Sequence, residues 1–376
     1  MPVTSLGCPR LRYPGRAVGN PCPSRIVRIV SDASLAPLTT IGLGGPAATL
    51  VTAADASEIA EAVRLADATG RPLLVLAGGS NVVIADEGFT GTVVLVRSGG
   101  VVAARRGEDI ELTVQAGHDW DELVEESVVE GWSGLECLSG IPGSTGATPI
   151  QNVGAYGAEI SETLIDVTAL DRVRHEIVQL SAQECGFGYR HSTFKETDRY
   201  VVLSVRFRLR PSLDSRPLRY GELTRVLGVP AGGVAPLGDV RDAVLGLRRS
   251  KGMVLDPDDP DTRSVGSFFT NPVLEPEVFE ELEIRLPEAP PRWEAADGRV
   301  KTSAAWLIER AGFRRGYGRD GVAISSKHTL ALTNRGDGTT TALLDLAEEI
   351  VAGVQGAYGV TLVPEPRLVG VELPVG

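Results

Sequence analysis

Residues 138–157 read "LSGIPGSTGATPIQNVGAYG", a stretch with five glycines, two prolines and no charged side chain. Charged residues make up 23% of the chain as a whole, so twenty consecutive positions without one stand out. Glycine allows a neighbouring group to approach the backbone closely and leaves the amide groups free to bind an anion. The stretch therefore predicts a loop whose main chain lies against a partner, and a phosphate-bearing ligand is a candidate for that partner.

The bulk composition limits the class of protein. A chain of 376 residues with 43% hydrophobic residues is long enough for two or three domains. A net charge of −12 argues against a nucleic-acid surface, and no apolar run approaches the length of a membrane span. The four cysteines and four histidines lack metal-site spacing, so we expect no metal. We expect a reduced, cytoplasmic protein that is a monomer, with an oligomer left open.

The hydrophobic pattern predicts alternating strands and helices from about residue 38. Expected strands are 47–53, 72–77, 91–96, 109–117, 164–172, 176–182 and 200–210, and expected helices are 57–70 and 119–130. After a polar, proline-bearing region we expect a third unit. Its elements are a helix at 303–312, a strand at 329–334, a helix at 341–354 and a strand-like tail at 359–370.

One dinucleotide fingerprint can be excluded. "GLGGPA" (42–47) matches G-x-G-x-x-A, but the "ATLVTA" segment that follows is β-like, whereas a Rossmann loop must open a helix. The chain instead has three glycine-rich turns, at 42–47, 78–81 and 140–157. Each turn by itself could be no more than a tight loop. Three of them in an acidic chain favour a large phosphate-bearing cofactor held by backbone amides.

Five motifs, in order, resemble one family. They are "AGGSNVVIAD" (77–86), "GLECLSGIPGSTGATPIQNVGAYGAEI" (134–160), "FGYRHSTFK" (187–195), "GSFFTNP" (266–272) and "PEPRLVG" (364–370). The resemblance is to the UDP-N-acetylenolpyruvoylglucosamine reductases, in the subtype with a tyrosine loop. It implies an α+β fold: a two-part FAD-binding module of the vanillyl-alcohol-oxidase (PCMH) type, followed by a C-terminal α/β substrate-binding domain.

The resemblance and the element pattern together imply a division of the chain. Residues 1–30, with five arginines and no acidic residue, are expected to be a disordered arm. The first FAD-binding subdomain covers 31–97 and is joined by a C-terminal strand at 356–376. The second subdomain covers 98–210. The tyrosine loop and the substrate-binding domain cover 211–355.

The activity implied by the resemblance is a reduction in peptidoglycan precursor synthesis. NADPH reduces non-covalently bound FAD, and UDP-N-acetylglucosamine enolpyruvate is then reduced to UDP-N-acetylmuramate. That chemistry needs a cation for the developing negative charge and an acid for the proton. The motifs assign Arg190 to the substrate carboxylate, Glu365 to its polarisation and Ser267 to proton donation.

The same motifs imply the remaining site residues. Substrate contacts are expected from Tyr220 over the uridine diphosphate, and from Lys251 and Asn271 at the diphosphate and sugar. Cofactor contacts are expected from Gly78, Gly79, Ser80, Asn81, Gly140, Pro142, Gly143, Gly146, Ala147, Gln151, Asn152, Gly154, Ala155 and Tyr156.

Two other functions are compatible with parts of the pattern. Another FAD-dependent carbohydrate oxidoreductase would share the cofactor fold, but many of these tether the flavin through a histidine beside the 78–81 turn, and "AGGSN" has none. A non-catalytic flavin or sugar-nucleotide binding protein would be free to lose Ser267 or Glu365, and both are present.

Overall fold

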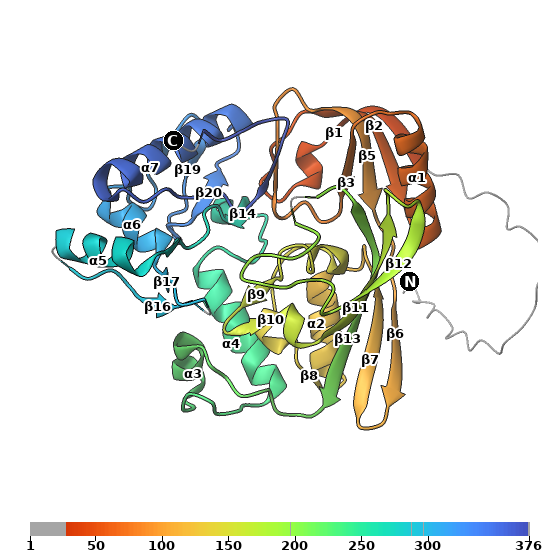
Figure 1. Ribbon diagram of the computed structural model, residues 1–376, viewed down its shortest axis with the longest axis horizontal. Helices are drawn as coiled ribbons and strands as arrows, with labels where there is room; N and C mark the ends of the chain where they lie inside the picture. Colours follow the sequence, from red (N-terminus) through yellow and green to blue (C-terminus); the bar gives the residue numbers. More distant parts are fainter. Residues whose placement is uncertain (1–27, 196, 287, 296, 375–376) are drawn as a thin grey trace, which may run out of the picture.

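The computed structural model describes residues 28–374 except residues 196, 287 and 296 (Figure 1). The first sheet has the strand order β1-β2-β5-β3, with β1 antiparallel to β2 and the other neighbours parallel. Its strands are β1 (Arg28–Ser34), β2 (Pro46–Ala53), β3 (Leu73–Leu76) and β5 (Phe89–Val96). Because β2 directly follows the 42–47 turn, the exclusion of a Rossmann loop is confirmed.

Two of the expected helices begin at acidic N-caps. In α1 (Ala56–Ala68) the Asp55 side chain accepts a hydrogen bond from the Glu58 amide at 2.9 Å, and α1 buries an apolar stripe. In α2 (Trp120–Val129) the Asp119 side chain accepts from the amides of the first turn. These bonds satisfy amides that otherwise have no partner inside the helix.

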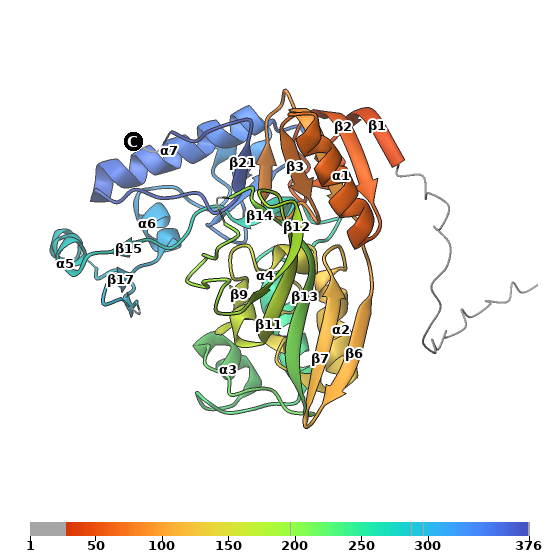
Figure 2. The same cartoon turned by 45° about the vertical axis from the view of Figure 1, so that its right-hand side comes forward.

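The second sheet is antiparallel and has the order β12-β11-β13-β7-β6, with β8 paired to β13. Figure 2 shows α2 lying behind this sheet, and the Trp120 and Phe207 rings meet edge to face with centroids 5.9 Å apart. The strands are β6 (Val101–Arg106), β7 (Asp109–Gln115), β8 (Trp132–Ser133), β11 (Leu164–Asp171), β12 (Glu176–Ser181) and β13 (Tyr200–Pro211).

Two helices occupy a region in which the sequence reading expected only a polar connection and a loop. They are α3 (Gly221–Leu227) and α4 (Leu237–Ser250), and they pack together through the buried side chains Leu223, Val240 and Val244. A buried apolar stripe on α4 supplies most of this contact. Tyr220, the tyrosine of the expected loop, directly precedes this packed helical pair.

The third unit surrounds a sheet of order β14-β20-β19-β18 and a smaller sheet of order β15-β17-β16. Its strands are β14 (Ser264–Ser267), β15 (Val273–Leu274), β16 (Trp293–Glu294), β17 (Val300–Lys301), β18 (Gly318–Arg319), β19 (Val322–Ile324) and β20 (Ala331–Asn334). Its helices are α5 (Pro276–Arg285), α6 (Ala304–Arg310) and α7 (Thr340–Tyr358). None of the helices within the described residues is both long and apolar enough to cross a bilayer.

The chain ends differ from the expected boundaries. Residues 28–30, placed in the arm from the sequence, belong to β1 and pair with β2; the rest of the expected arm, residues 1–27, lies outside the described residues. At the other end α7 continues to Tyr358, so the expected strand-like tail is reduced to β21 (Arg367–Val369). This short strand runs parallel to β4 (Val82–Ile84), so the end of the chain lies against a strand of the N-terminal part.

Candidate active site

A cavity of about 1070 Å³ opens where the three units meet. Its walls are the turn at 78–81, the loop at 141–155, strand β14 with the residues that follow it, and the segment at 363–368. Typical ligand cavities measure about 300–1,000 Å³. The cavity is therefore large enough for more than one small ligand, which fits a cofactor together with a substrate.

The glycines of two loops fit against one another at the wall of this cavity. A Cβ atom on Gly78 would lie 2.5 Å from Gly143 Cα, and one on Gly79 would lie 2.0 Å from the Leu38 carbonyl oxygen. Side chains at these positions would force the loops apart. The main chain of residues 138–157 thus packs closely against the 78–81 turn. The two loops together form a backbone-lined surface, called the glycine cradle below, that fits a phosphate-bearing cofactor.

The third glycine-rich turn, residues 42–47, does not line the cavity. A Cβ atom on Gly45 would lie 2.1 Å from the Asp86 carbonyl oxygen, and Gly44 packs against Ile84. The expectation of three anion-binding turns is therefore wrong for this one. Its glycines allow the turn to pack on the loop after β4.

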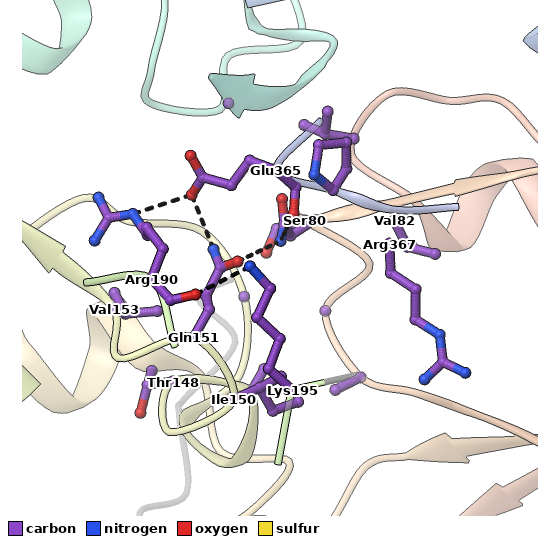
Figure 3. A pocket seen from close by; sticks show the side chains of 18 of the residues that line it. Ser80, Val82, Thr148, Ile150, Gln151, Val153, Arg190, Lys195, Glu365 and Arg367 are labelled. Carbon is purple, nitrogen blue, oxygen red and sulfur yellow. Dashed lines mark hydrogen bonds and ion pairs between the residues drawn. The ribbon is translucent and has the colours of Figure 1, made fainter. Parts of the chain in front are cut away.

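Arg190 and Glu365 form an ion pair on the cavity wall, with 3.1 Å between Arg190 Nε and Glu365 Oε1 (Figure 3). Arg190 Nη2 also donates to the Gly154 carbonyl at 2.8 Å, and Lys195 Nζ donates to the Arg190 carbonyl at 3.0 Å. Arg190 has a φ of 50°, a conformation that is uncommon away from glycine. Such strain persists where surrounding contacts fix it, and it is frequent at functional sites.

Glu365 is also held by a chain of side-chain amides. Gln151 Nε2 donates to Glu365 Oε1 at 3.0 Å, and Asn81 Nδ2 donates to Gln151 Oε1 at 3.1 Å. Burial raises the pKa of Glu365, while Arg190, Lys195 and Gln151 oppose that rise. Both donors engage Oε1, so Oε2 remains available to a ligand among the described contacts.

Ser267 is the last residue of β14 and is positioned by the residue that follows it, Phe268. The Phe268 amide donates to the Leu330 carbonyl at 2.7 Å, and the Glu365 amide donates to the Phe268 carbonyl at 2.8 Å. The Phe268 ring is fully buried, which anchors this segment. The three residues predicted to be catalytic, Ser267, Arg190 and Glu365, all line the same cavity.

Most of the other predicted site residues line this cavity as well, and five do not. Those on the wall are Gly78, Gly79, Ser80, Asn81, Pro142, Gly143, Gly146, Ala147, Gln151, Gly154, Ala155 and Asn271. Two of the five have structural partners: the Gly140 amide donates to Asp121 at 2.6 Å, and the buried Asn152 side chain donates to Glu159 at 2.7 Å. The others are Tyr156, Tyr220 and Lys251.

Tyr156, Tyr220 and Lys251 form a second cluster beside the cavity. The two tyrosine rings meet edge to face with centroids 5.3 Å apart, and Lys251 Nζ lies 5.9 Å from the Tyr156 ring centroid. Burial raises the pKa of Tyr156 to about 12, and the Arg248 guanidinium, itself on the cavity wall, opposes this rise. Tyr156, predicted to touch the cofactor, thus packs instead with two predicted substrate contacts.

Sequence reasoning missed several basic residues of the cavity wall, among them Lys195 and Arg248. Lys195 belongs to the quoted "FGYRHSTFK" motif, five positions after Arg190, and received no role. Arg248 lies near the end of α4, a helix that was not expected. The apolar spacing of Leu237, Val240 and Val244 is the signal that would have revealed that helix.

The fold and the cavity define the class of protein. Residues 47–181 match the model of the FAD binding domain family, and this range contains both loops of the glycine cradle. With the third unit, the fold is a two-part FAD-binding module of the vanillyl-alcohol-oxidase type plus a C-terminal domain. The chain is a flavoprotein.

Similarity to known proteins then gives the family. Residues 258–369 match the C-terminal domain model of UDP-N-acetylenolpyruvoylglucosamine reductase. The enzyme of that name from Thermobifida fusca is 57% identical over 90% of this chain and 97% of its own, and that from Streptomyces coelicolor is 54% identical over 96% and 95%. The chain belongs to the UDP-N-acetylenolpyruvoylglucosamine reductase family.

A solved structure shows the same fold. The reductase from Thermus caldophilus superposes with a TM-score of 0.61 at 24% sequence identity, covering 91% of this chain and 98% of that one.

Proposed function

We propose that the chain reduces UDP-N-acetylglucosamine enolpyruvate to UDP-N-acetylmuramate with NADPH as the reductant, in the cytoplasmic synthesis of peptidoglycan precursors. The observation that carries this proposal is the meeting of Arg190, Glu365 and Ser267 on one cavity that the glycine cradle also lines. A cation, a carboxyl group and a hydroxyl are the groups that this reduction needs. Because peptidoglycan forms the cell wall, the product would contribute to cell shape and cell division.

The bound FAD supplies the redox chemistry, a hydride taken from NADPH and delivered to the enolpyruvyl double bond. Arg190 binds and orients the substrate carboxylate. Its Nε and Nη2 atoms are engaged by Glu365 and Gly154, which leaves Nη1 to donate to the substrate. The guanidinium thereby stabilises the negative charge that spreads into the carboxylate during the reaction.

Ser267 donates the proton to the carbon next to the substrate carboxylate. Arg190 stays protonated and cannot act as the acid. Glu365 Oε1 is engaged by Gln151 and Arg190, so we assign Glu365 to polarising the substrate carboxylate through Oε2. A serine hydroxyl is a weak acid, and it is adequate here because the carbon that receives the proton is strongly basic.

The substrate's nucleotide end extends toward the second cluster. Asn271 Oδ1 accepts from the Ala304 amide at 3.0 Å, which fixes the Asn271 side chain on the cavity wall, where we place the sugar. Tyr220 and Lys251 then bind the uridine diphosphate at the edge of the cavity. A basic residue is needed there, since the chain carries a net charge of −12.

The visible spectrum of the purified protein tests this function. We expect bound flavin that is bleached by NADPH in the absence of oxygen and recovers its colour when UDP-N-acetylglucosamine enolpyruvate is added. A colourless protein that does not oxidise NADPH would support a binding role instead. Oxygen consumption with simple sugars, without recovery by the enolpyruvyl substrate, would support a carbohydrate oxidase.

A further inference from the structure

We propose that Glu222 is an internal counterion. Its carboxylate pairs with Lys251 until the diphosphate of the substrate takes its place. This inference rests on the proposed function, because it takes Lys251 as a diphosphate contact. In this inference, Glu222 sets the affinity of the protein for the nucleotide.

The pair is close and specific. Lys251 Nζ lies 2.6 Å from Glu222 Oε2, within hydrogen-bond distance. Lys251 is the residue that caps the C-terminal end of α4, and Glu222 lies in the first turn of α3, directly after Tyr220 and Gly221. The carboxylate therefore lies in the same segment as Tyr220, the proposed contact to the uridine diphosphate.

The surroundings of Lys251 are basic. The pKa of His328 is lowered to about 4, first by burial and then by Lys251, Arg315 and Arg248, while the Glu309 carboxylate, which pairs with Arg315, opposes this shift. Glu222 also acts on the Tyr156 hydroxyl, whose pKa it helps to raise. Glu222 is thus the carboxylate that faces this group of cations from α3, where an anionic ligand would have to bind.

The pair can be broken at low cost. The side chains of Lys251 and Glu222 are 30% and 35% exposed, and ion pairs of such exposure contribute little to stability. The helix itself does not need to move, because Leu223 is fully buried against α4 while the Glu222 side chain points to the lysine. Rotation of one side chain would release Lys251.

The exchange has a consequence for affinity. A diphosphate carries more negative charge than one carboxylate and therefore displaces Glu222 from Lys251. The binding free energy then includes the cost of breaking the ion pair and of leaving the Glu222 carboxylate close to the bound diphosphate. Removing the Glu222 charge should tighten nucleotide binding and slow release. Glu222 would thereby limit retention of the UDP-bearing product.

A double-mutant cycle with UDP as the probe tests this inference on the flavin-loaded protein. We expect Glu222→Gln to tighten UDP binding, measured by titration calorimetry, roughly two- to fivefold, the range that an exposed ion pair is worth. In a Lys251→Met background the same substitution should change the dissociation constant by less than this. Glu222→Asp, which shortens the side chain, should give a smaller gain.

The matched control is Glu277→Gln, the same loss of charge in the first turn of another helix, α5, which should leave UDP affinity unchanged. Weaker or unchanged UDP binding by Glu222→Gln would overturn the inference, as would equal tightening with and without Lys251. If the unaltered protein holds flavin but binds no UDP, the proposed function itself fails, which is a separate result.

Discussion

The backbone of Phe268 connects two residues of the proposed reaction, Ser267 and Glu365. It follows Ser267 in the chain, and its carbonyl accepts the amide of Glu365 at 2.8 Å. Because the Phe268 ring is fully buried, small side-chain changes at Ser267 should leave this scaffold in place. The serine can therefore be tested without disturbing the carboxyl group.

We expect Ser267→Ala to separate the two half-reactions. Flavin bleaching by NADPH should stay close to the normal rate, because hydride transfer to the flavin needs no proton from this serine. Recovery by the enolpyruvyl substrate should slow by about 10²–10⁴-fold, the usual contribution of a positioned general acid. Ser267→Cys should retain part of the activity. Stopped-flow absorbance gives both rates, and equal slowing of the two would remove Ser267 from the acid role.

His328 gives the protein a pH dependence of stability whose sign follows from its surroundings. Burial lowers its pKa from 6.5 to about 4, assisted by Lys251, Arg315 and Arg248. Its Nδ1 accepts a hydrogen bond from the Leu330 amide at 3.0 Å, which requires that nitrogen to be unprotonated. Between these two pKa values the unfolded chain binds a proton that the folded chain does not.

The free energy of unfolding should therefore fall as the pH is lowered from 6.5 to 4. The contribution of His328 to this fall is about 3 kcal/mol, from the size of the shift. We expect His328→Gln to flatten that part of the curve, measured by urea unfolding at several pH values. His191, for which no such burial is seen, serves as the control through His191→Gln. An unchanged slope in His328→Gln would contradict the assignment.

Sequence motifs predicted single residues well where the chemistry requires a particular side chain. Arg190, Ser267 and Glu365 lie on one cavity, where contacts between the motifs hold them: Arg190 pairs with Glu365, and the Glu365 amide donates to the carbonyl of Phe268, next to Ser267. The glycines were harder to interpret. A glycine that admits a ligand and a glycine that admits another loop look the same in a sequence, so the role of the 42–47 turn and the packing of Gly78 on Gly143 became evident only in three dimensions.

At the scale of elements, helix ends show how the units are joined. The N-terminus of α7 is capped from outside its own unit, by Asp86 in the loop after β4. Asp86 accepts from the amides of Thr340 at 2.8 Å and Thr341 at 2.9 Å, and from the Thr341 hydroxyl. These hydrogen bonds outweigh burial, so the pKa of Asp86 is lowered. The carboxylate thus stabilises α7 and ties it to the first sheet.

Asp86→Ala should lower the free energy of unfolding by about 1–2 kcal/mol, the range for losing a helix cap. Because the folded pKa lies below the unfolded value of 3.8, this contribution is present above that value and is lost as the pH falls through the folded pKa. Chemical unfolding at neutral pH checks the size, with Asp86→Asn as the conservative variant that should recover part of it. Equal stability of Asp86→Ala and the unaltered protein would show that the cap contributes nothing.

The elements that sequence periodicity identified are those with a long apolar stripe or a clear cap, such as α1 and α2. Helix α4 has the same kind of stripe, but three prolines and several glycines in the segment before it, residues 217–236, obscured it. The end of α7 was placed four residues early, since its true end is set by Gly359, with a φ of 70°. The short β21 depends wholly on its partner strand and has no local signal of its own.

At the scale of the whole molecule, β21 connects two hydrophobic cores. Leu368 packs against the core of the third unit, whereas Val369 is buried in the core of the first sheet. The Arg367 amide also donates to the Asn81 carbonyl at 3.0 Å, so the strand supports the 78–81 turn of the cradle. The last segment of the chain therefore holds the cofactor loop and the third unit in one arrangement.

Truncation after Pro366 should consequently release FAD, even if the second sheet stays folded. The truncated chain loses the pairing of β21 with β4, the Arg367 bond to Asn81 and the burial of Val369 together, and the turn at 78–81 then lacks support on one side. Flavin absorbance per mole of purified protein measures the effect, with truncation after Pro374 as the control that keeps β21. Val369→Ala should act in the same direction but less strongly, with a loss of about 1–3 kcal/mol of stability from the buried methyl groups. Full flavin content in the chain that ends at Pro366 would mean that the cradle is held by the first two units alone.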